Sequence, residues 1–277
     1  MTANPWDQLA EADGSGVRLA VIDTGIAADH PRFAQQSIEA YRVNPPADGS
    51  ADGYSLERLD RADDPVGHGT AVADLVHRVA PGVQLISIQL LAASRRGTTA
   101  ALLAALQHLA DLDIHAVNLS LSTQRADLAG PLSHELDEAY AQGRAVVAAE
   151  GYGDASRDYP ASFASCIGVT YTACPIGVLR YRQGRLVEFE AAGINLDLAW
   201  GAGPEATTRR VTGSSYACPI VAGLCARLLS AEPGLPPFAV KSRLHELAQA
   251  VPPGLSHGSD PSVGPTDWLA AAQSAPV

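Results

Sequence analysis

Short apolar segments of strand length alternate with helix-like segments between residues 83 and 149, and this alternation constrains the fold most strongly. VQLISIQL (83–90), HAVNLSLS (115–122) and RAVVAA (144–149) have the length and composition of buried strands. TTAALLAALQHLADL (98–112) and SHELDEAYAQG (133–143) repeat apolar residues at helical spacing. Such alternation produces βαβ units, in which helices cover both faces of the sheet. The sequence therefore predicts an α/β fold, a three-layer sandwich with a mainly parallel central β-sheet.

The rest of the chain extends this pattern. VRLAVI (17–22) is a further strand, QG at 183–184 marks a hairpin, and residues 215–230 and 236–250 have helical periodicity. The polar, Pro- and Asp-rich stretch 44–66 is predicted to be a loop. No repeat or linker interrupts the 277 residues, so we expect residues 1–277 to form one domain.

Composition excludes several classes of partner. The formal net charge of -11 is not offset by any long Lys/Arg cluster, which argues against nucleic acid and against an anionic membrane surface. No apolar run approaches the roughly 20 residues of a membrane span, and the first residues do not resemble a signal peptide, so we expect a cytoplasmic protein. The four cysteines lack zinc-type spacing and are predicted to be free, buried thiols.

Three short stretches carry candidate catalytic residues in the order Asp, His, Ser. Asp23 lies in VIDTG, His68 in GHGTAVA and Ser215 in GSSYACPIVAG. Each residue alone is more often a turn or cap residue. Together they meet the needs of nucleophilic catalysis, because a serine hydroxyl requires a base, and a histidine base requires a carboxylate that fixes its tautomer.

These stretches resemble the subtilisin-like serine peptidases, the subtilase family. That family's nucleophile motif, Gly-Thr-Ser-Met-Ala-x-Pro, matches Gly213 to Pro219 with Ser214 in place of Thr and Tyr216 in place of Met. NLSLS (118–122), YPAS (159–162) and VGPTDWLAAA (263–272) extend the resemblance over most of the chain. The resemblance implies a subtilisin-like fold and a serine endopeptidase that uses Asp23, His68 and Ser215 through an acyl-enzyme.

The sequence departs from the family at the oxyanion hole. Where the family has Ala-Gly-Asn-x-Gly, this chain has Ala149-Glu150-Gly151-Tyr152-Gly153, so either Tyr152 or Gly151 takes the Asn position. Three interpretations stay open. Tyr152 or a backbone N–H donates instead, the enzyme is slow and selective, or the chain is a non-catalytic relative. An ionised Glu150 would repel an oxyanion, so we expect it to face substrate or solvent.

Substrate contacts are implied by the resemblance alone. An extended peptide would pair between Leu91-Ala92-Ala93 and Ser120-Leu121-Ser122, with Glu150 nearby. Arg95 and Arg96 follow the first of these segments and are either solvated or selective for acidic residues. The region after His68 continues to Ala80-Pro81-Gly82 without an oxygen-rich loop, so we predict no calcium there, no other metal and no cofactor.

The expected function is that of a selective intracellular processing protease. The short segment before Asp23 leaves no room for a pro-domain, and an unrestrained protease would harm the cell, so leader removal from a peptide precursor is one expected task. The expected partners are a peptide or protein substrate and a biosynthetic or activating protein. Two alternatives remain: an acyl transferase or macrocyclase related to this family, and a catalytically impaired pseudoprotease that binds peptides.

Overall fold

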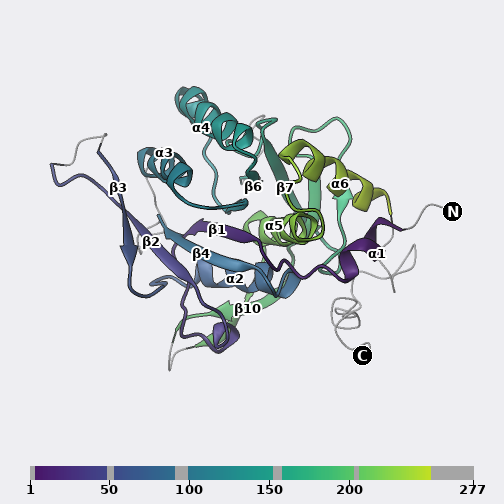
Figure 1. Cartoon of the computed structure of the whole chain (residues 1–277), viewed down its shortest axis with the longest axis horizontal. Helices are drawn as coiled ribbons and strands as arrows, with labels where there is room; N and C mark the ends of the chain where they lie inside the picture. Colours follow the sequence, from purple (N-terminus) through teal and green to yellow (C-terminus); the bar gives the residue numbers. More distant parts are fainter. Residues whose placement is uncertain (1–3, 49–52, 91–98, 152–157, 203–205, 251–277) are drawn as a thin grey trace.

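A nine-stranded sheet forms the centre of the computed structural model, which describes residues 4–48, 53–90, 99–151, 158–202 and 206–250 (Figure 1). The strand order is β3-β2-β4-β1-β5-β6-β7-β9-β8, and every neighbouring pair is parallel except β2–β3 and β8–β9. Two further strands, β10 and β11, form an antiparallel hairpin. The strands are β1 (Arg18–Asp23), β2 (Glu39–Asn44), β3 (Ser55–Leu59), β4 (Gln84–Gln89), β5 (Ala116–Leu119), β6 (Ala145–Ala149), β7 (Cys166–Thr172), β8 (Arg180–Tyr181), β9 (Phe189–Ala192), β10 (Leu196–Trp200) and β11 (Thr207–Val211).

Helices cover both faces of this sheet. In Figure 1, α3 and α4 lie on one side, and α2 and α5 lie on the other. Single turns of 3-10 helix occur at Pro31–Phe33, Leu109–Asp111 and Ala126–Leu128. The α-helices are α1 (Pro5–Ala10), α2 (His68–Val79), α3 (Thr99–His108), α4 (Ala129–Ala141), α5 (Ser214–Ala231) and α6 (Pro237–Gln249).

The central strands are buried on both faces, so their residues divide between two apolar cores. In β6, Val147 belongs to the core beneath α2 and α5, whereas Val146 and Ala148 belong to the core beneath α3 and α4. Successive side chains of a strand point to opposite faces, which is why an uninterrupted apolar run fits a sheet covered on both sides. The predicted three-layer α/β sandwich is therefore confirmed.

The segment 44–66 differs from its prediction as a loop. It contains β3, which pairs antiparallel with β2 at one edge of the sheet. The burial of β3 alternates only weakly, with Leu56 and Leu59 partly covered and the intervening residues exposed. An edge strand of this kind has few apolar residues, because one face and one edge meet water. Its composition therefore resembles that of a loop.

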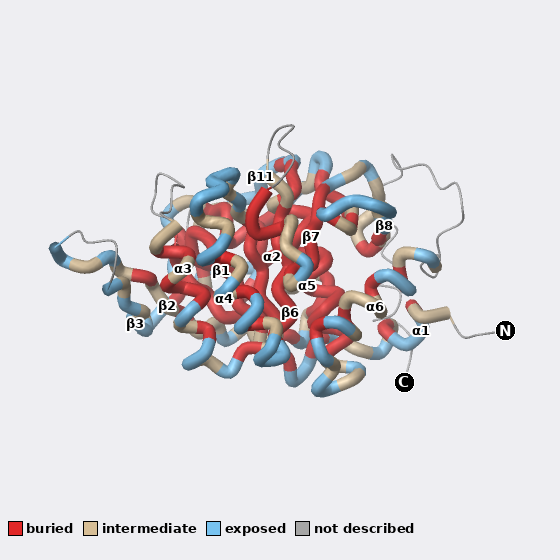
Figure 2. Tube along the Cα trace, turned by 90° about the horizontal axis from the view of Figure 1, so that it is seen from above, coloured by how far each residue is buried: buried red, intermediate tan, exposed pale blue. Residues whose placement is uncertain are grey.

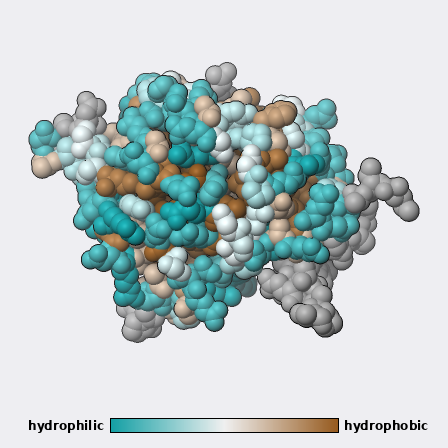
Figure 3. Space-filling view, in the orientation of Figure 1, coloured by the Kyte–Doolittle hydropathy of each residue, from teal (hydrophilic) through white to brown (hydrophobic). Residues whose placement is uncertain are grey.

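Helix α5 runs through the interior. Among the described helices it is the one long and apolar enough to cross a membrane, yet 83% of its apolar window is buried inside the fold. It packs against α2 and against strands β5, β6, β7 and β9, and Figure 2 shows it within the buried centre. Polar side chains cover most of the face in Figure 3, with apolar residues in a band across its middle. The apolar character of α5 thus reflects its position in the core.

Candidate active site

Asp23 and His68 meet at the carboxyl ends of the central strands. Asp23 is the last residue of β1, which lies between β4 and β5, and its side chain is fully buried. Its Oδ1 lies 2.7 Å from Nδ1 of His68 and also accepts a hydrogen bond of 2.7 Å from the Thr24 N–H. A carboxylate in this position holds the imidazole in one orientation and favours the tautomer with hydrogen on Nδ1.

Glycines allow the first turn of α2 to approach the end of β1. A Cβ added at Gly69 would lie 2.1 Å from the carbonyl oxygen of Gly25 and 3.1 Å from Cβ of Asp23. Gly67, the residue before the helix, has φ of 93°, which side-chain-bearing residues rarely adopt. The GHG sequence therefore permits both the turn and the close contact that bring His68 to Asp23.

Asp64 fixes the start of the histidine helix. Its Oδ1 accepts hydrogen bonds from the N–H groups of Val66 and Gly67, at 2.9 and 2.8 Å. Its Oδ2 accepts from the Thr70 N–H at 2.9 Å and from the Thr70 hydroxyl at 2.7 Å. The Thr70 N–H is one of the donors that the first turn of a helix leaves free, the Val66 and Gly67 N–H groups belong to the turn before it, and the negative charge is favoured at this end of the helix. Sequence reasoning missed this residue, because Asp64 stands before the N-cap residue Gly67, outside the position at which a cap signal is read from sequence.

Replacing Asp64 with Ala is expected to lower the free energy of unfolding by about 3 kcal/mol, because four donors lose a buried acceptor. Urea denaturation followed by circular dichroism measures this change. Asp63→Ala is the matched control, since its side chain is 57% exposed and lies 3.4 Å from Arg42, so less than about 1 kcal/mol is expected. Equal effects of the two substitutions would contradict the capping role.

Ser215 occupies the second position of α5, and that helix is fixed on both sides of the site. The hydroxyl of Ser214 donates to the carbonyl of Glu150, after β6, at 2.5 Å. The carbonyl of Ser215 accepts from the hydroxyl of Ser120, after β5, at 2.9 Å. Pro219 has no N–H with which to bond the Ser215 carbonyl four residues earlier, so that carbonyl is left for Ser120. The Ser-to-Pro spacing of the motif thus connects the nucleophile helix to β5.

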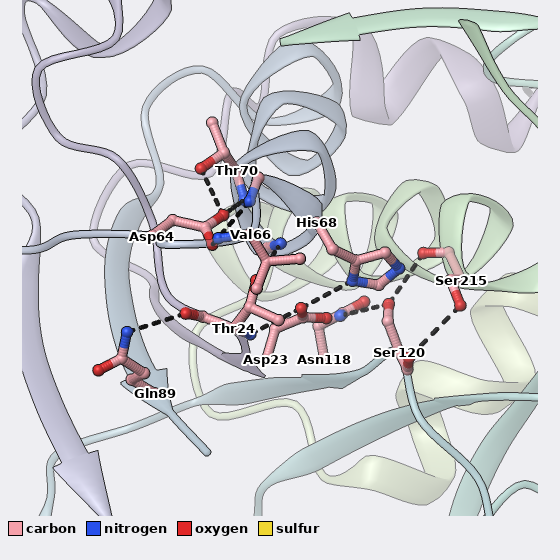
Figure 4. A network of polar contacts seen from close by, with 12 residues as sticks. Asp23, Thr24, Asp64, Val66, His68, Thr70, Gln89, Asn118, Ser120 and Ser215 are labelled. Carbon is pink, nitrogen blue, oxygen red and sulfur yellow. Dashed lines mark hydrogen bonds and ion pairs between the residues drawn. The ribbon is translucent and has the colours of Figure 1, made fainter. Parts of the chain in front are cut away.

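The ring of His68 lies between Asp23 and Ser215, with its second nitrogen on the side of Ser215 (Figure 4). The Ser215 hydroxyl donates to the Ser120 carbonyl at 3.4 Å, and no described hydrogen bond joins it to His68. Such contacts are often long in enzymes without substrate. A change of the Ser215 rotamer would bring its hydroxyl toward the imidazole. Tyr216, in place of the family's Met, packs against the same imidazole with ring centroids 5.5 Å apart.

The other predicted site residues fall into two groups. Ser120 is buried beside Ser215, Leu121 is half-buried and Ser122 is exposed, so this predicted substrate segment does flank the serine. Gly151 follows β6 and lies next to Glu150, whose carbonyl bonds to the start of α5 from the side opposite Ser120. Outside the described residues lie Leu91, Ala92, Ala93, Arg95, Arg96 and Tyr152, whose predicted roles stay predictions.

Glu150 has a cationic partner that the sequence did not indicate. Its carboxylate lies 3.5 Å from Nη1 of Arg182, and Nε of Arg182 lies 3.4 Å from Glu190. Arg182 follows β8, so the hairpin predicted around Gln183 carries this charge to the end of β6. The side chain of Glu150 is 29% exposed, and its charge is therefore offset by Arg182 and partly by solvent.

In the described part of the chain, no group of three or more His, Cys, Asp or Glu side chains is placed so that it could hold a metal ion. After α2 the chain passes through Ala80 and Val83 directly into β4. The absence of a calcium site stays a prediction, which a melting temperature unchanged by a chelator would support.

The arrangement of Asp23, His68 and Ser215 agrees with the sequence similarity of this chain to known proteins. Residues 14–264 match the subtilase family. This chain belongs to the subtilase family. Among its relatives, Subtilisin DY of Bacillus licheniformis is 31% identical over 255 residues, which cover 85% of this chain and 84% of that protein. Thermitase of Thermoactinomyces vulgaris is 26% identical over 231 residues, covering 81% and 78% of the two chains. As a subtilase, the protein is a serine endopeptidase.

Solved structures resemble this subtilase in fold. A cold-adapted subtilisin-like serine proteinase superposes with a TM-score of 0.63 at 24% identity, covering 84% of this chain and 82% of the other. Sphericase superposes with a TM-score of 0.65 at 22% identity, covering 84% and 83%. At these identities the likeness concerns the fold.

Proposed function

We propose that Ser215 is the nucleophile of this subtilase, His68 its general base and Asp23 the group that orients His68. The observation that carries the proposal is the 2.7 Å contact between Asp23 and Nδ1 of His68, with Ser215 on the other side of the same ring (Figure 4). The three side chains come from the end of β1, the start of α2 and the start of α5. Each is held by contacts that do not involve the other two.

The proposed reaction passes through an acyl-enzyme. The Ser215 oxygen attacks the scissile carbonyl carbon while His68 Nε2 takes its proton, and the imidazolium is stabilised by Asp23. His68 then gives that proton to the departing amine as the C–N bond breaks. Water, deprotonated by His68, attacks the ester and releases the acid and the free serine.

The oxyanion would be stabilised from two sides. The first turn of α5 contains Ser215, whose N–H has no carbonyl four residues earlier within the helix to bond, whereas the Tyr216 N–H in the same turn donates to the Gly213 carbonyl at 3.1 Å. The second donor of the family, an Asn side chain, is replaced here by Tyr152 or by a backbone N–H near Gly151. Loss of such a donor lowers the rate by about 10²–10³, which slows catalysis without abolishing it.

The proposed setting is the cytoplasm, and the proposed task is selective processing of a peptide or protein substrate, such as leader removal. The free cysteines support this setting, since none of the four forms a disulfide. Burial raises the pKa of Cys166 to about 12 and of Cys174 to about 11, and raises the pKa of Cys218 well above its usual range. Thiols of this kind are poor nucleophiles, so they would stay reduced and inert.

The test is covalent labelling with a fluorophosphonate probe, read by intact mass. We expect one adduct per chain in the wild type and a labelling rate about 10²–10³ lower in Tyr152→Phe if the phenol is the replacement donor. An unchanged rate would assign the second donor to the backbone. A wild type that takes no adduct would contradict the proposed nucleophile and favour a peptide-binding role.

Product mass then separates hydrolysis from acyl transfer. A model peptide is incubated with and without an added amine nucleophile. Hydrolysis adds the mass of one water to the pair of products, whereas transfer gives an amide or a cyclic product. Amide or ring formation as the main outcome would replace the hydrolytic proposal with the transferase one.

A further inference from the structure

Asp158 is a buried carboxylate beside the active site that the proposed mechanism does not use. It precedes Tyr159, which pairs antiparallel with Thr123 through hydrogen bonds of 2.8 and 2.9 Å. Thr123 directly follows the segment Ser120 to Ser122, whose first residue bonds to Ser215. Asp158 is therefore held at the far end of the segment that flanks the nucleophile.

The carboxylate of Asp158 has no cationic partner in the part of the chain that the structure describes. It is 3% exposed, and its Oδ1 accepts one hydrogen bond of 3.1 Å from Nε2 of Gln124. Among the described residues, no Lys, Arg or His forms an ion pair with it. A buried carboxylate is costly unless a charge or several donors compensate it. Glu150, the other acidic residue here, differs because Arg182 offsets it.

Gly151 allows this carboxylate to approach the backbone that follows β6. A Cβ added at Gly151 would lie 2.8 Å from Asp158 Oδ1 and 2.5 Å from Ser122 Oγ. The missing side chain thus lets the Asp158 carboxylate and the Ser122 hydroxyl converge on the backbone after β6. That backbone is joined to the nucleophile helix by the bond from Ser214 to Glu150. The Asp158 carboxylate therefore lies between the segment from Ser120 to Ser122 and the backbone after β6, the two segments that flank the nucleophile.

On the proposed function, a substrate residue that acylates Ser215 would direct its side chain between these same two segments, since both bond to the start of the nucleophile helix. In the proposed acyl-enzyme its carbonyl carbon would be bonded to Oγ of Ser215, its backbone would pair with the segment from Ser120 to Ser122, and its carbonyl oxygen would point toward the turn at Gly151. A long side chain from that position reaches toward the uncompensated carboxylate. Lys and Arg have both the length and the positive charge, and either would complete the bonding of Asp158.

We propose that Asp158 makes this subtilase selective for Lys or Arg at the substrate residue whose carbonyl is attacked. This specificity rests on the proposed function of Ser215. It differs from the sequence-based suggestion of Arg95 and Arg96, which concerned acidic residues farther upstream of the cut.

The test compares peptide substrates that differ only at that residue: Lys, Arg, Gln, norleucine and Leu. We expect kcat/KM to be at least about 100-fold higher for Lys and Arg than for the neutral residues, and Asp158→Asn to reduce this ratio about 100-fold. Norleucine and Gln control for length and polarity. Asp60→Asn is the charge-matched control, because Asp60 is exposed after β3 and its loss should leave the ratio unchanged.

A second measurement does not depend on turnover. Binding of the cation p-aminobenzamidine to the Ser215→Ala variant, followed by its fluorescence, is expected to weaken at least about 30-fold when Asp158→Asn is added. If the wild type is labelled by the fluorophosphonate but prefers substrates with a neutral residue, the Asp158 inference is overturned and the proposed function stands. A wild type that takes no label while Ser215→Ala binds p-aminobenzamidine through Asp158 would overturn the function and keep the cation site. Absence of binding would overturn the cation site itself.

Discussion

Replacement of Ser215 with Ala is expected to lower kcat for peptide hydrolysis by about 10⁶ and to abolish fluorophosphonate labelling. The expected size is that of nucleophile loss in subtilisin, where removing the serine costs about as much as removing the whole triad. Ser215 is half-buried and its hydroxyl makes only one long contact, of 3.4 Å to Ser120, so folding should be little affected. Initial rates with a chromogenic peptide measure the loss, and thermal unfolding confirms that the variant is folded.

Ser214→Ala is the matched control, because the motif presents two adjacent serines. The Ser214 hydroxyl bonds to the Glu150 carbonyl, so its removal should cost about 1 kcal/mol of stability and at most about tenfold in rate. If labelling survived in Ser215→Ala and disappeared in Ser214→Ala, the nucleophile would be Ser214 and the proposed geometry would be wrong.

Replacement of Asp23 with Asn is the second large effect, an expected fall of about 10⁴ in kcat. Oδ1 of Asp23 accepts from both His68 Nδ1 and the Thr24 N–H, and a neutral amide supports the wrong tautomer of the imidazole. The rate of labelling by the fluorophosphonate should fall with kcat, since both reactions need His68 as base.

Stability separates this electrostatic role from a structural one. Asp23 is fully buried, and among the described residues its Oδ2 has no hydrogen-bond partner. Because Asn removes a buried negative charge, the free energy of unfolding should stay equal or rise. A large loss of stability, or a fall in kcat of less than tenfold, would show that Asp23 does not act through His68.

Much of the fold was accessible from local sequence. The apolar runs predicted β1, β4, β5 and β6, and the glycine-flanked histidine predicted the start of α2 at His68. These features depend on hydrophobic periodicity and on turn residues, which are properties of neighbouring positions. The edge strand β3 was not predicted, because a strand exposed on one face and one edge has the composition of a loop.

The candidate active site was likewise predictable from the sequence only in part. The sequence by itself determined the residue types of the triad, their order along the chain, and the proline that leaves the Ser215 carbonyl unbonded within α5. Only the tertiary structure decided that Ser120 uses this carbonyl across 95 residues and that Arg182 offsets Glu150 across 32. It alone brought the carboxylate of Asp158 against Gly151. Such partners are chosen by how strands and helices pack, and packing depends on the whole chain, so no local pattern encodes them.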